Sequence, residues 1–271
     1  MIKQAMINHF AGSIALKIRG KWDCLFSAAF RPETAGTVIN DYFAARITTA
    51  LSGHLCDSQK SFVDVGAHIG SVISEVKRNR KDVSIIAFEA IPDKARNLIR
   101  KFPDATVHSC AAGPETDMVQ FYVDTKQSGY SSMLKPQESK DMNTKTITVQ
   151  VKRLDDVISH NSVGLIKIDV EGVELGVLRG AHELIAKSRP VIMFESAPPQ
   201  PNDIYSKGDM WEFFNERHYD LIIPIRVPHN GSGLTKEGFS ESHSYPRRTT
   251  NYFAIPSEQR DFVKNCMFNS M

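Results

Sequence analysis

The chain has 271 residues, 41% hydrophobic and 24% charged, which is typical of a globular protein. Its formal net charge of +2 gives no overall field that would draw it to nucleic acid or an acidic membrane, so no nucleic-acid partner is expected. No apolar run reaches the ~18 residues of a transmembrane helix. Four widely separated cysteines, without metal or redox spacing, predict free thiols and a cytoplasmic location: Cys24, Cys56, Cys110 and Cys266.

Residues 1–59 predict an N-terminal helical extension. Its first 22 residues contain no signal-peptide core, because Lys3, Gln4, Asn8 and His9 interrupt the apolar pattern. An amphipathic helix that touches a partner or a membrane is one interpretation. Packing against the main domain is the favoured one.

From residue 60 the pattern alternates between short apolar strands and helices. Strands are expected at 61–65, 83–89 and 105–111, with one helix ending near Asn79 and another beginning at Pro92. This alternation predicts βαβ units and a parallel sheet that is buried on both faces.

The alternation is interrupted and then resumes. Residues 118–123 and 146–154 alternate like the strands of a small antiparallel insertion. The later elements, in order, are a strand at 163–170, a helix at 171–188, a strand at 189–195, a helix at 210–218, a strand at 219–225, a polar loop at 226–248 and a strand at 250–256. Residues 60–256 are therefore predicted to form one domain, with 257–271 as a C-terminal tail.

The turn after the first strand reads Gly66-Ala67-His68-Ile69-Gly70. A dinucleotide-binding turn would carry a glycine at His68, so an NAD-dependent oxidoreductase is a less favoured alternative. Asp64 ends the strand within reach of a ligand ammonium group, and Glu89 ends the second strand, where a carboxylate accepts ribose hydroxyls. These features together predict S-adenosylmethionine as the ligand.

The sequence resembles the FkbM-type S-adenosylmethionine-dependent methyltransferases. The matching segments are FVDVGAHIG, AFEAIP, KRLDDVI and IKIDVEGVELGVLRGAHELI, in family order, with NYFAIP as the last strand. The resemblance implies an α/β fold: a seven-stranded Rossmann-like class I methyltransferase sheet, mostly parallel with an antiparallel last strand, with helices on both faces. It also implies methyl transfer to a hydroxyl of a sugar, glycolipid or natural product.

The cofactor-binding residues expected on this basis lie on four turns. They are Asp64, Gly66, Ala67, His68, Gly70, Glu89, Ala90, Ala111 and Asp169. His68 stands where the family commonly has asparagine. Besides the cofactor, the resemblance implies a small-molecule hydroxyl acceptor, a glycan or a glycosylated metabolite, as the partner. Whether the protein forms a homo-oligomer is left open.

The segment IKIDVEGVE places Asp169 at a strand end, with Glu171 and Glu174 in the first turn of the next helix. Asp169 is the favoured general base, ahead of Glu171 and of Glu195, which ends the next strand. The alternative is that Asp169 caps the helix while the glutamates favour its positive end. No D/N-P-P-Y/F turn for holding a flipped base is present.

Substrate contacts are expected from Ser131 and Ser132, in the insertion, and from His229, in the long polar loop. His68, His229 and His243 are weaker candidates for the base. No metal site is expected, with a divalent ion on Asp169 and Glu171 as an alternative. A non-catalytic S-adenosylmethionine-binding or scaffold protein is the other functional alternative, against which the intact set of predicted cofactor residues weighs.

Overall fold

The computed structural model describes residues 14–124, 131–134, 144–158, 162–201, 203–245 and 247–268. Most of the segment between the two predicted insertion strands, residues 124–145, lies outside these residues. Among the helices that are described, none is both long enough and apolar enough to cross a membrane. The four cysteines are free thiols, as predicted.

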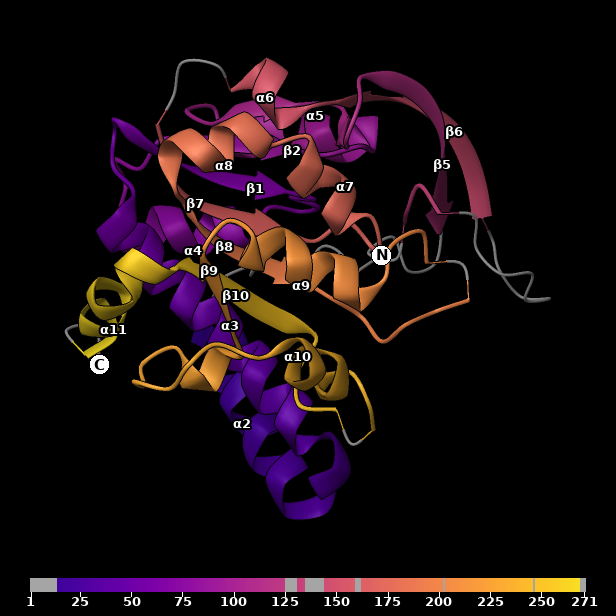
Figure 1. The fold of residues 1–271 in the computed structure, drawn as a ribbon. Coiled ribbons are helices and arrows are strands. Elements are labelled where there is room, and N and C mark those ends of the chain that lie inside the picture. The colour runs from indigo at the N-terminus through magenta and orange to yellow at the C-terminus, as the bar shows by residue number, and fades with distance from the viewer. Residues whose placement is uncertain are drawn as a thin grey trace.

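A seven-stranded sheet forms the centre of the molecule, in the order β3-β2-β1-β7-β8-β10-β9 (Figure 1). Its strands are β1 Lys60–Val65, β2 Ile85–Phe88, β3 Thr106–His108, β7 Ser162–Ile168, β8 Val191–Glu195, β9 Tyr219–Ile222 and β10 Asn251–Pro256. Five neighbouring strands run parallel: β3, β2, β1, β7 and β8. The strand β10 pairs antiparallel with both β8 and β9. The predicted fold class is therefore confirmed.

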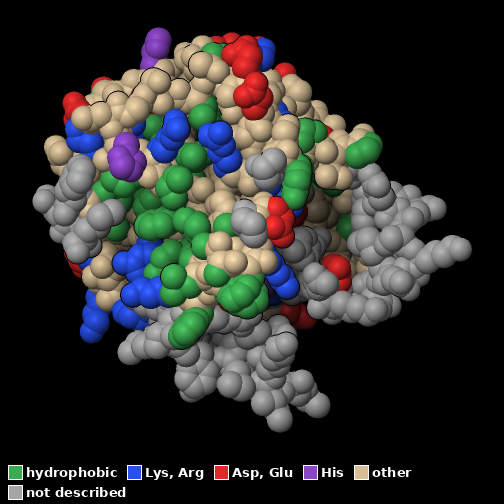
Figure 2. All heavy atoms as spheres, turned by 90° about the horizontal axis from the view of Figure 1, so that it is seen from below, with side chains coloured by type: hydrophobic (Ala, Val, Ile, Leu, Met, Phe, Trp, Pro, Cys, Tyr) green, Lys and Arg blue, Asp and Glu red, His purple; other side chains and the backbone are tan. Residues whose placement is uncertain are grey.

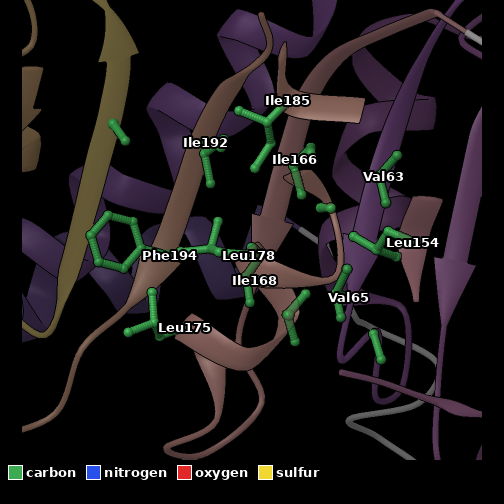
Figure 3. Close-up of a cluster of buried hydrophobic side chains, with 14 of the residues drawn as sticks. Val63, Val65, Leu154, Ile166, Ile168, Leu175, Leu178, Ile185, Ile192 and Phe194 are labelled. Atoms are coloured by element: carbon green, nitrogen blue, oxygen red, sulfur yellow. The ribbon is translucent and has the colours of Figure 1, made fainter. Parts of the chain in front are cut away.

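Helices cover both faces of this sheet because its central strands are apolar on both sides. One layer contains α3 Pro32–Leu55, α4 Ser71–Asn79, α5 Pro92–Lys101 and α11 Arg260–Phe268. The other contains α6 Leu154–Val157, α7 Glu174–Arg179, α8 His182–Ser188, α9 Lys207–Asn215 and α10 Lys236–Ser242. Figure 3 shows the second core, where Ile166, Ile192 and Phe194 from the sheet meet Leu178 and Ile185 from the helices. Burial of these side chains stabilises the fold.

A second sheet of three strands packs beside the carboxyl ends of the main sheet. It contains β4 Ala111–Ala112, β5 Asp117–Asp124 and β6 Thr144–Lys152, with β5 and β6 antiparallel as predicted. The expected strand at 105–111 was wrong in its extent. It divides at Ser109 and Cys110, and its end pairs with β6 instead of continuing the main sheet.

Several other predicted elements differ from the structure. The helix at 210–218 lies at Lys207–Asn215, and the strand at 219–225 ends at Ile222. The single helix at 171–188 is two helices, α7 and α8, separated at Gly180 and Ala181. Asp155 explains why a new helix begins at His182. Its carboxylate accepts the backbone N–H groups of Glu183 and Leu184, so it caps α8 from another part of the chain. The polar loop at 226–248 contains the helix α10, whose N-cap is Thr235.

The N-terminal region forms a helical hairpin, with α2 Ile14–Phe30 antiparallel to α3. α3 packs on the sheet through Ile47, Leu51 and Leu55, which are all buried. α2 contacts α3 instead of the sheet, and the hairpin projects at the bottom of the molecule in Figure 1. At the other end of the chain, α11 packs against α3.

Candidate active site

A pocket of about 530 Å³, open to solvent, lies at the carboxyl ends of β1, β2 and β7. This is the edge at which doubly wound sheets bind ligands. Six predicted cofactor residues line it: Gly66, His68, Glu89, Ala90, Ala111 and Asp169. Two other predicted residues, Ser131 and Glu171, line it as well.

The β1 turn is held by backbone contacts that exclude a larger residue at Gly66. Gly66 has φ +79°, and a Cβ placed there would lie 1.9 Å from the carbonyl oxygen of Asp169. The N–H groups of Gly66 and Ala67 both donate to Phe88 O, which ties the turn to β2. The glycine thus lets the β1 and β7 turns meet. Gly70 has a different function: it begins α4 with φ +75° and packs against Leu98 and Phe102.

Glu89 lies on the pocket wall and is 6% exposed. One carboxylate oxygen accepts the His68 N–H at 2.8 Å, and the other accepts the Ile91 N–H at 2.9 Å. Burial nevertheless raises the pKa of Glu89. A carboxylate has about four lone-pair sites, so this geometry leaves acceptors for two ribose hydroxyls. Glu89 therefore fits its predicted role.

His68 also lines the pocket, and its backbone has the left-handed φ of +50°. Burial, followed by the charge of Lys94, lowers the pKa of His68 to about 4, so the imidazole is neutral at pH 7. Lys94, at the start of α5, is a pocket residue that sequence reasoning missed. Its position two residues after Pro92 was the available signal.

Asp64 lies beneath the pocket instead of lining it. It is 1% exposed, and its carboxylate faces the ammonium group of Lys167, at 3.3 Å. That contact is an ion pair between two buried side chains. The structure thus gives Asp64 an internal cation in place of the predicted ligand ammonium. Ala67 and Gly70 lie outside the lining too, and the cofactor roles of all three stay predictions.

Lys167 joins the two turns of the site, and sequence reasoning assigned it no role. It is 5% exposed in β7, donates to Gly66 O at 2.9 Å, and lies 3.3 Å from both Asp64 and Asp169. Burial alone would lower the pKa of Lys167, but the two carboxylates outweigh it and raise it. The ammonium group is therefore charged, and it stabilises both the β1 turn and Asp169.

Three carboxylates meet where β7 and β8 end, because parallel neighbours bring their carboxyl ends to one edge. Oxygens of Asp169, Glu171 and Glu195 lie within 4.8 Å of one another. Burial raises the pKa of Glu195 to about 9, helped by the charge of Asp169, and the two side chains share a hydrogen bond. Glu195 therefore carries a proton at pH 7, and its O–H group donates the hydrogen bond to Asp169.

Asp169 and Glu171 differ in their readiness to take a proton. Burial would raise the pKa of Asp169, but Lys167 and the hydrogen bond from Glu195 outweigh it and lower that pKa. Burial, and then the charges of Asp169 and Glu174, raise the pKa of Glu171 to about 7. Of the two, Glu171 is thus the better base near neutral pH.

The β7 turn that carries Glu171 is irregular, and this corrects the predicted helix start. Glu171 has φ +57° and Gly172 has φ +99°, while α7 begins only at Glu174. The N-cap of α7 is Val173, so Asp169 does not cap the helix. Glu174 accepts the N–H groups of Val170 and Gly172 and thereby stabilises the turn.

The predicted substrate residues have different environments. Ser131 lines the pocket, whereas Ser132 donates to the Glu171 carbonyl at 2.7 Å and so supports the β7 turn. His229 is exposed, lies outside the pocket lining, and accepts from Arg260 of α11 through its carbonyl. His243 is buried and outside the lining. Its Nδ1 donates to Phe239 O and its Nε2 accepts from Ser196, which follows Glu195.

Fold and site together define a class I methyltransferase: a seven-stranded sheet with one antiparallel strand, a glycine turn after β1 and an acid after β2. Residues 64–221 match the family model described as the methyltransferase FkbM domain. This is more than half of the chain, and the protein belongs to that family. S-adenosylmethionine is the cofactor, and the free acceptor sites on Glu89 fit its ribose.

Three individual proteins that are similar to this chain share 28% or less of its sequence. The chain is 28% identical to "Methyltransferase 1" of Beauveria bassiana (strain ARSEF 2860), over 44% of this chain and 57% of that protein. The crystal structure of a methyltransferase FkbM from Methylobacillus flagellatus KT is similar over 73% of this chain and 43% of that one, with 20% identity and a TM-score of 0.45. A geranyl diphosphate methyltransferase, solved with SAM, is similar over 78% and 84%, with 12% identity and a TM-score of 0.39.

Proposed function

We propose that this protein is an O-methyltransferase that transfers the methyl group of S-adenosylmethionine to a hydroxyl of a sugar, glycolipid or other natural product. The observation that carries the proposal is the meeting of three acidic side chains at the cofactor pocket: Asp169 and Glu171 line the pocket, and Glu195 lies beside them. A hydroxyl is a poor nucleophile, and a carboxylate that accepts its proton during the reaction raises the rate.

When bound, the cofactor supplies an activated methyl group, so the protein has to position the acceptor and accept its proton. Glu171 is the proposed base, because it lines the pocket and its pKa of about 7 suits proton transfer at neutral pH. Asp169 was favoured from the sequence alone. Its ion pair with Lys167 and its hydrogen bond from Glu195 make it the weaker base, and we assign it to orienting the acceptor hydroxyl.

The charges at the pocket also support a neutral acceptor. The negative charge of Asp169, and of Glu171 once it has lost its proton, would repel phosphate groups, whereas carboxylates accept hydrogen bonds from hydroxyls. Sugar-bearing acceptors offer many hydroxyls, and the family resemblance supports the same class. Oligomeric state and cellular location stay predictions.

A labelled-methyl assay tests this function. The protein is incubated with methyl-labelled cofactor and a panel of sugars, glycolipids and glycosylated small molecules, and the site of methylation is determined by NMR. Glu171→Gln should lose transfer, while Glu237→Gln, at an exposed glutamate of α10, should not. Methylation at nitrogen or carbon would overturn the hydroxyl assignment. Cofactor binding without any transfer would favour the non-catalytic alternative.

A further inference from the structure

The helix α2 presents an apolar face to solvent. Trp22, Leu25, Phe26 and Phe30 are 67%, 65%, 52% and 71% exposed, and their spacing places them on one side of the helix. The opposite side faces α3, where Ser27 is buried and Cys24 Sγ contacts Val38 O. A surface helix normally turns its apolar side toward the protein, so this reversed orientation indicates a binding surface.

Exposed basic residues adjoin this face. Lys21 lies on α2 itself, where Asp23 is an exposed acid. Arg31 follows the helix, with its guanidinium 5.9 Å from the centre of the Phe26 ring. Figure 2, which views the molecule from below, shows hydrophobic side chains intermixed with Lys and Arg on this side.

A neighbouring loop adds to the same surface. Tyr245 is 79% exposed, and Arg247 and Arg248 are exposed beside it. The carbonyls of these arginines accept hydrogen bonds from Thr37 and Asn40 of α3, which fixes the loop against the hairpin. Glu33, near the tip, is an acidic residue of this region, so the basic residues outnumber the acidic ones.

The hairpin is also connected to the carboxylate cluster. Asn251 pairs with Glu195 across the β10–β8 ladder, and its side chain donates to Asp41 of α3 at 2.9 Å. One short chain of contacts thus joins the carboxylate cluster to α3. Asp41 of α3 thus meets the sheet at the carboxyl end of β8, the same edge at which the carboxylate cluster lies.

We propose that α2 and the adjoining loop form a docking surface for an anionic phospholipid bilayer. The docking surface consists of Trp22, Leu25, Phe26, Phe30 and Tyr245 with Lys21, Arg31, Arg247 and Arg248. Aromatic side chains insert at the boundary between headgroups and acyl chains, and the basic side chains bind anionic headgroups. The helix lies in the interface and does not span the membrane. Resting on the proposed function, we further infer that the acceptor is held in that membrane.

Trp22 provides a direct probe, because the chain has only two tryptophans and Trp211→Phe leaves Trp22 as the sole one. The variant is mixed with phosphatidylcholine vesicles, either pure or containing about 30% phosphatidylglycerol. We expect a blue shift of Trp22 emission with the anionic vesicles, reversed by high salt. Co-sedimentation of the otherwise native protein should fall at least about tenfold in the triple variant Trp22→Ser, Phe26→Ser, Phe30→Ser. Phe262→Ser, at an exposed phenylalanine of α11, is the matched control.

Three results would overturn the docking surface. One is equal binding, or none, with both kinds of vesicle. Another is a dimer in light scattering that the triple variant dissociates, which would make the face an interface between two copies of the chain. The third is Trp22 emission that is already blue-shifted and protected from acrylamide in buffer, which would mean that the protein itself covers the face.

The two proposals can fail separately. Vesicle binding does not require methyl transfer, so it tests the docking surface even if no acceptor is found. With an acceptor in hand, the triple variant should methylate a detergent-dispersed acceptor at the normal rate and a vesicle-embedded one at least about tenfold more slowly. Equal loss on both acceptors would reject the link between docking and catalysis.

Discussion

The turns that follow β1 and β7 lie side by side and have similar backbones but different chemistry. Each contains glycine with positive φ and one other residue in the left-handed region, His68 at +50° and Glu171 at +57°. Such conformations cost energy and persist where the surroundings hold them. In the β1 turn the constraint directs a backbone N–H to Glu89. In the β7 turn it holds a carboxylate on the pocket wall.

The electrostatics of the two turns diverge accordingly. His68 is neutral, since burial lowers its pKa to about 4, whereas burial and neighbouring acids raise the pKa of Glu171 to about 7. The first turn thus suits recognition, and the second suits proton transfer. Lys167 binds both turns, so they form one unit instead of two independent motifs.

The largest effect is expected where the two turns touch. Gly66→Ala would place a methyl group 1.9 Å from the Asp169 carbonyl at a positive φ, so one of the turns has to move. We expect the free energy of unfolding to fall by about 3 kcal/mol or more, together with loss of cofactor binding. Urea unfolding measures it, and Gly231→Ala, with no heavy atom within 4 Å of the new Cβ, is the control. Equal stability of the two variants would contradict the close contact.

Next in size is the removal of the ammonium group that joins the turns. Lys167→Met leaves Asp64 buried without its cation, which should lower the free energy of unfolding by about 3 kcal/mol. The double variant Lys167→Met, Asp64→Asn removes the stranded charge and should recover part of that loss. Thermal unfolding of both variants tests this. A double variant no more stable than the single one would show that Asp64 is not the group that needs Lys167.

Glu171→Gln tests the chemistry of the β7 turn. An amide keeps the shape of the side chain but cannot accept a proton, so kcat should fall at least about a hundredfold with little change in cofactor affinity. For the native enzyme, kcat/KM should rise with pH up to about 7 and then level off, because the base must lose its proton before it can act. Near-normal turnover by the variant would move attention to Asp169 and Glu195.

Glu89→Ala tests the β1 side of the comparison. Losing a carboxylate that accepts ribose hydroxyls should weaken S-adenosylhomocysteine binding by about one to two decades, at roughly 1.5–3 kcal/mol for charge-assisted hydrogen bonds. Calorimetric titration measures it, with Glu115→Ala, at an exposed site, as the control. Unchanged affinity would remove Glu89 from the cofactor site.

The β1 turn was predictable from sequence because its demands are local. Glycine at positive φ, a strand and a following acid all appear within 30 residues. Lys167 was not predictable, since a single lysine in a strand is ordinarily exposed and its partner Asp64 lies in another strand. The division of the predicted helix at Gly180 was missed for a similar reason. A Cβ at Gly180 would lie 2.0 Å from Gly113 O, a contact that only the folded chain makes.

The carboxylate cluster was predictable from the sequence in part. Adjacent parallel strands made it possible to predict that Asp169 and Glu195 meet at one edge. Their protonation was not predictable, because it depends on the distance from Asp169 to Lys167 and on the hydrogen bond with Glu195. That dependence is why the favoured base changes from Asp169 to Glu171.

The smallest effect is expected at His68, where side chain and backbone have separable functions. The contact that fixes Glu89 comes from the His68 N–H, at 2.8 Å, and every residue except proline supplies that group. Asparagine also tolerates the left-handed backbone at φ +50° better than most residues do. His68→Asn should therefore keep the turn and change S-adenosylhomocysteine affinity by less than about threefold. His68→Val is the contrast, because a β-branched side chain opposes positive φ and should cost about 1–3 kcal/mol of folding stability. Calorimetric titration and urea unfolding of the two His68 variants test this prediction.

A large loss of affinity in His68→Asn, with stability unchanged, would show that the imidazole itself binds the cofactor. The function of the β1 turn would then depend on a side chain, as the function of the β7 turn does.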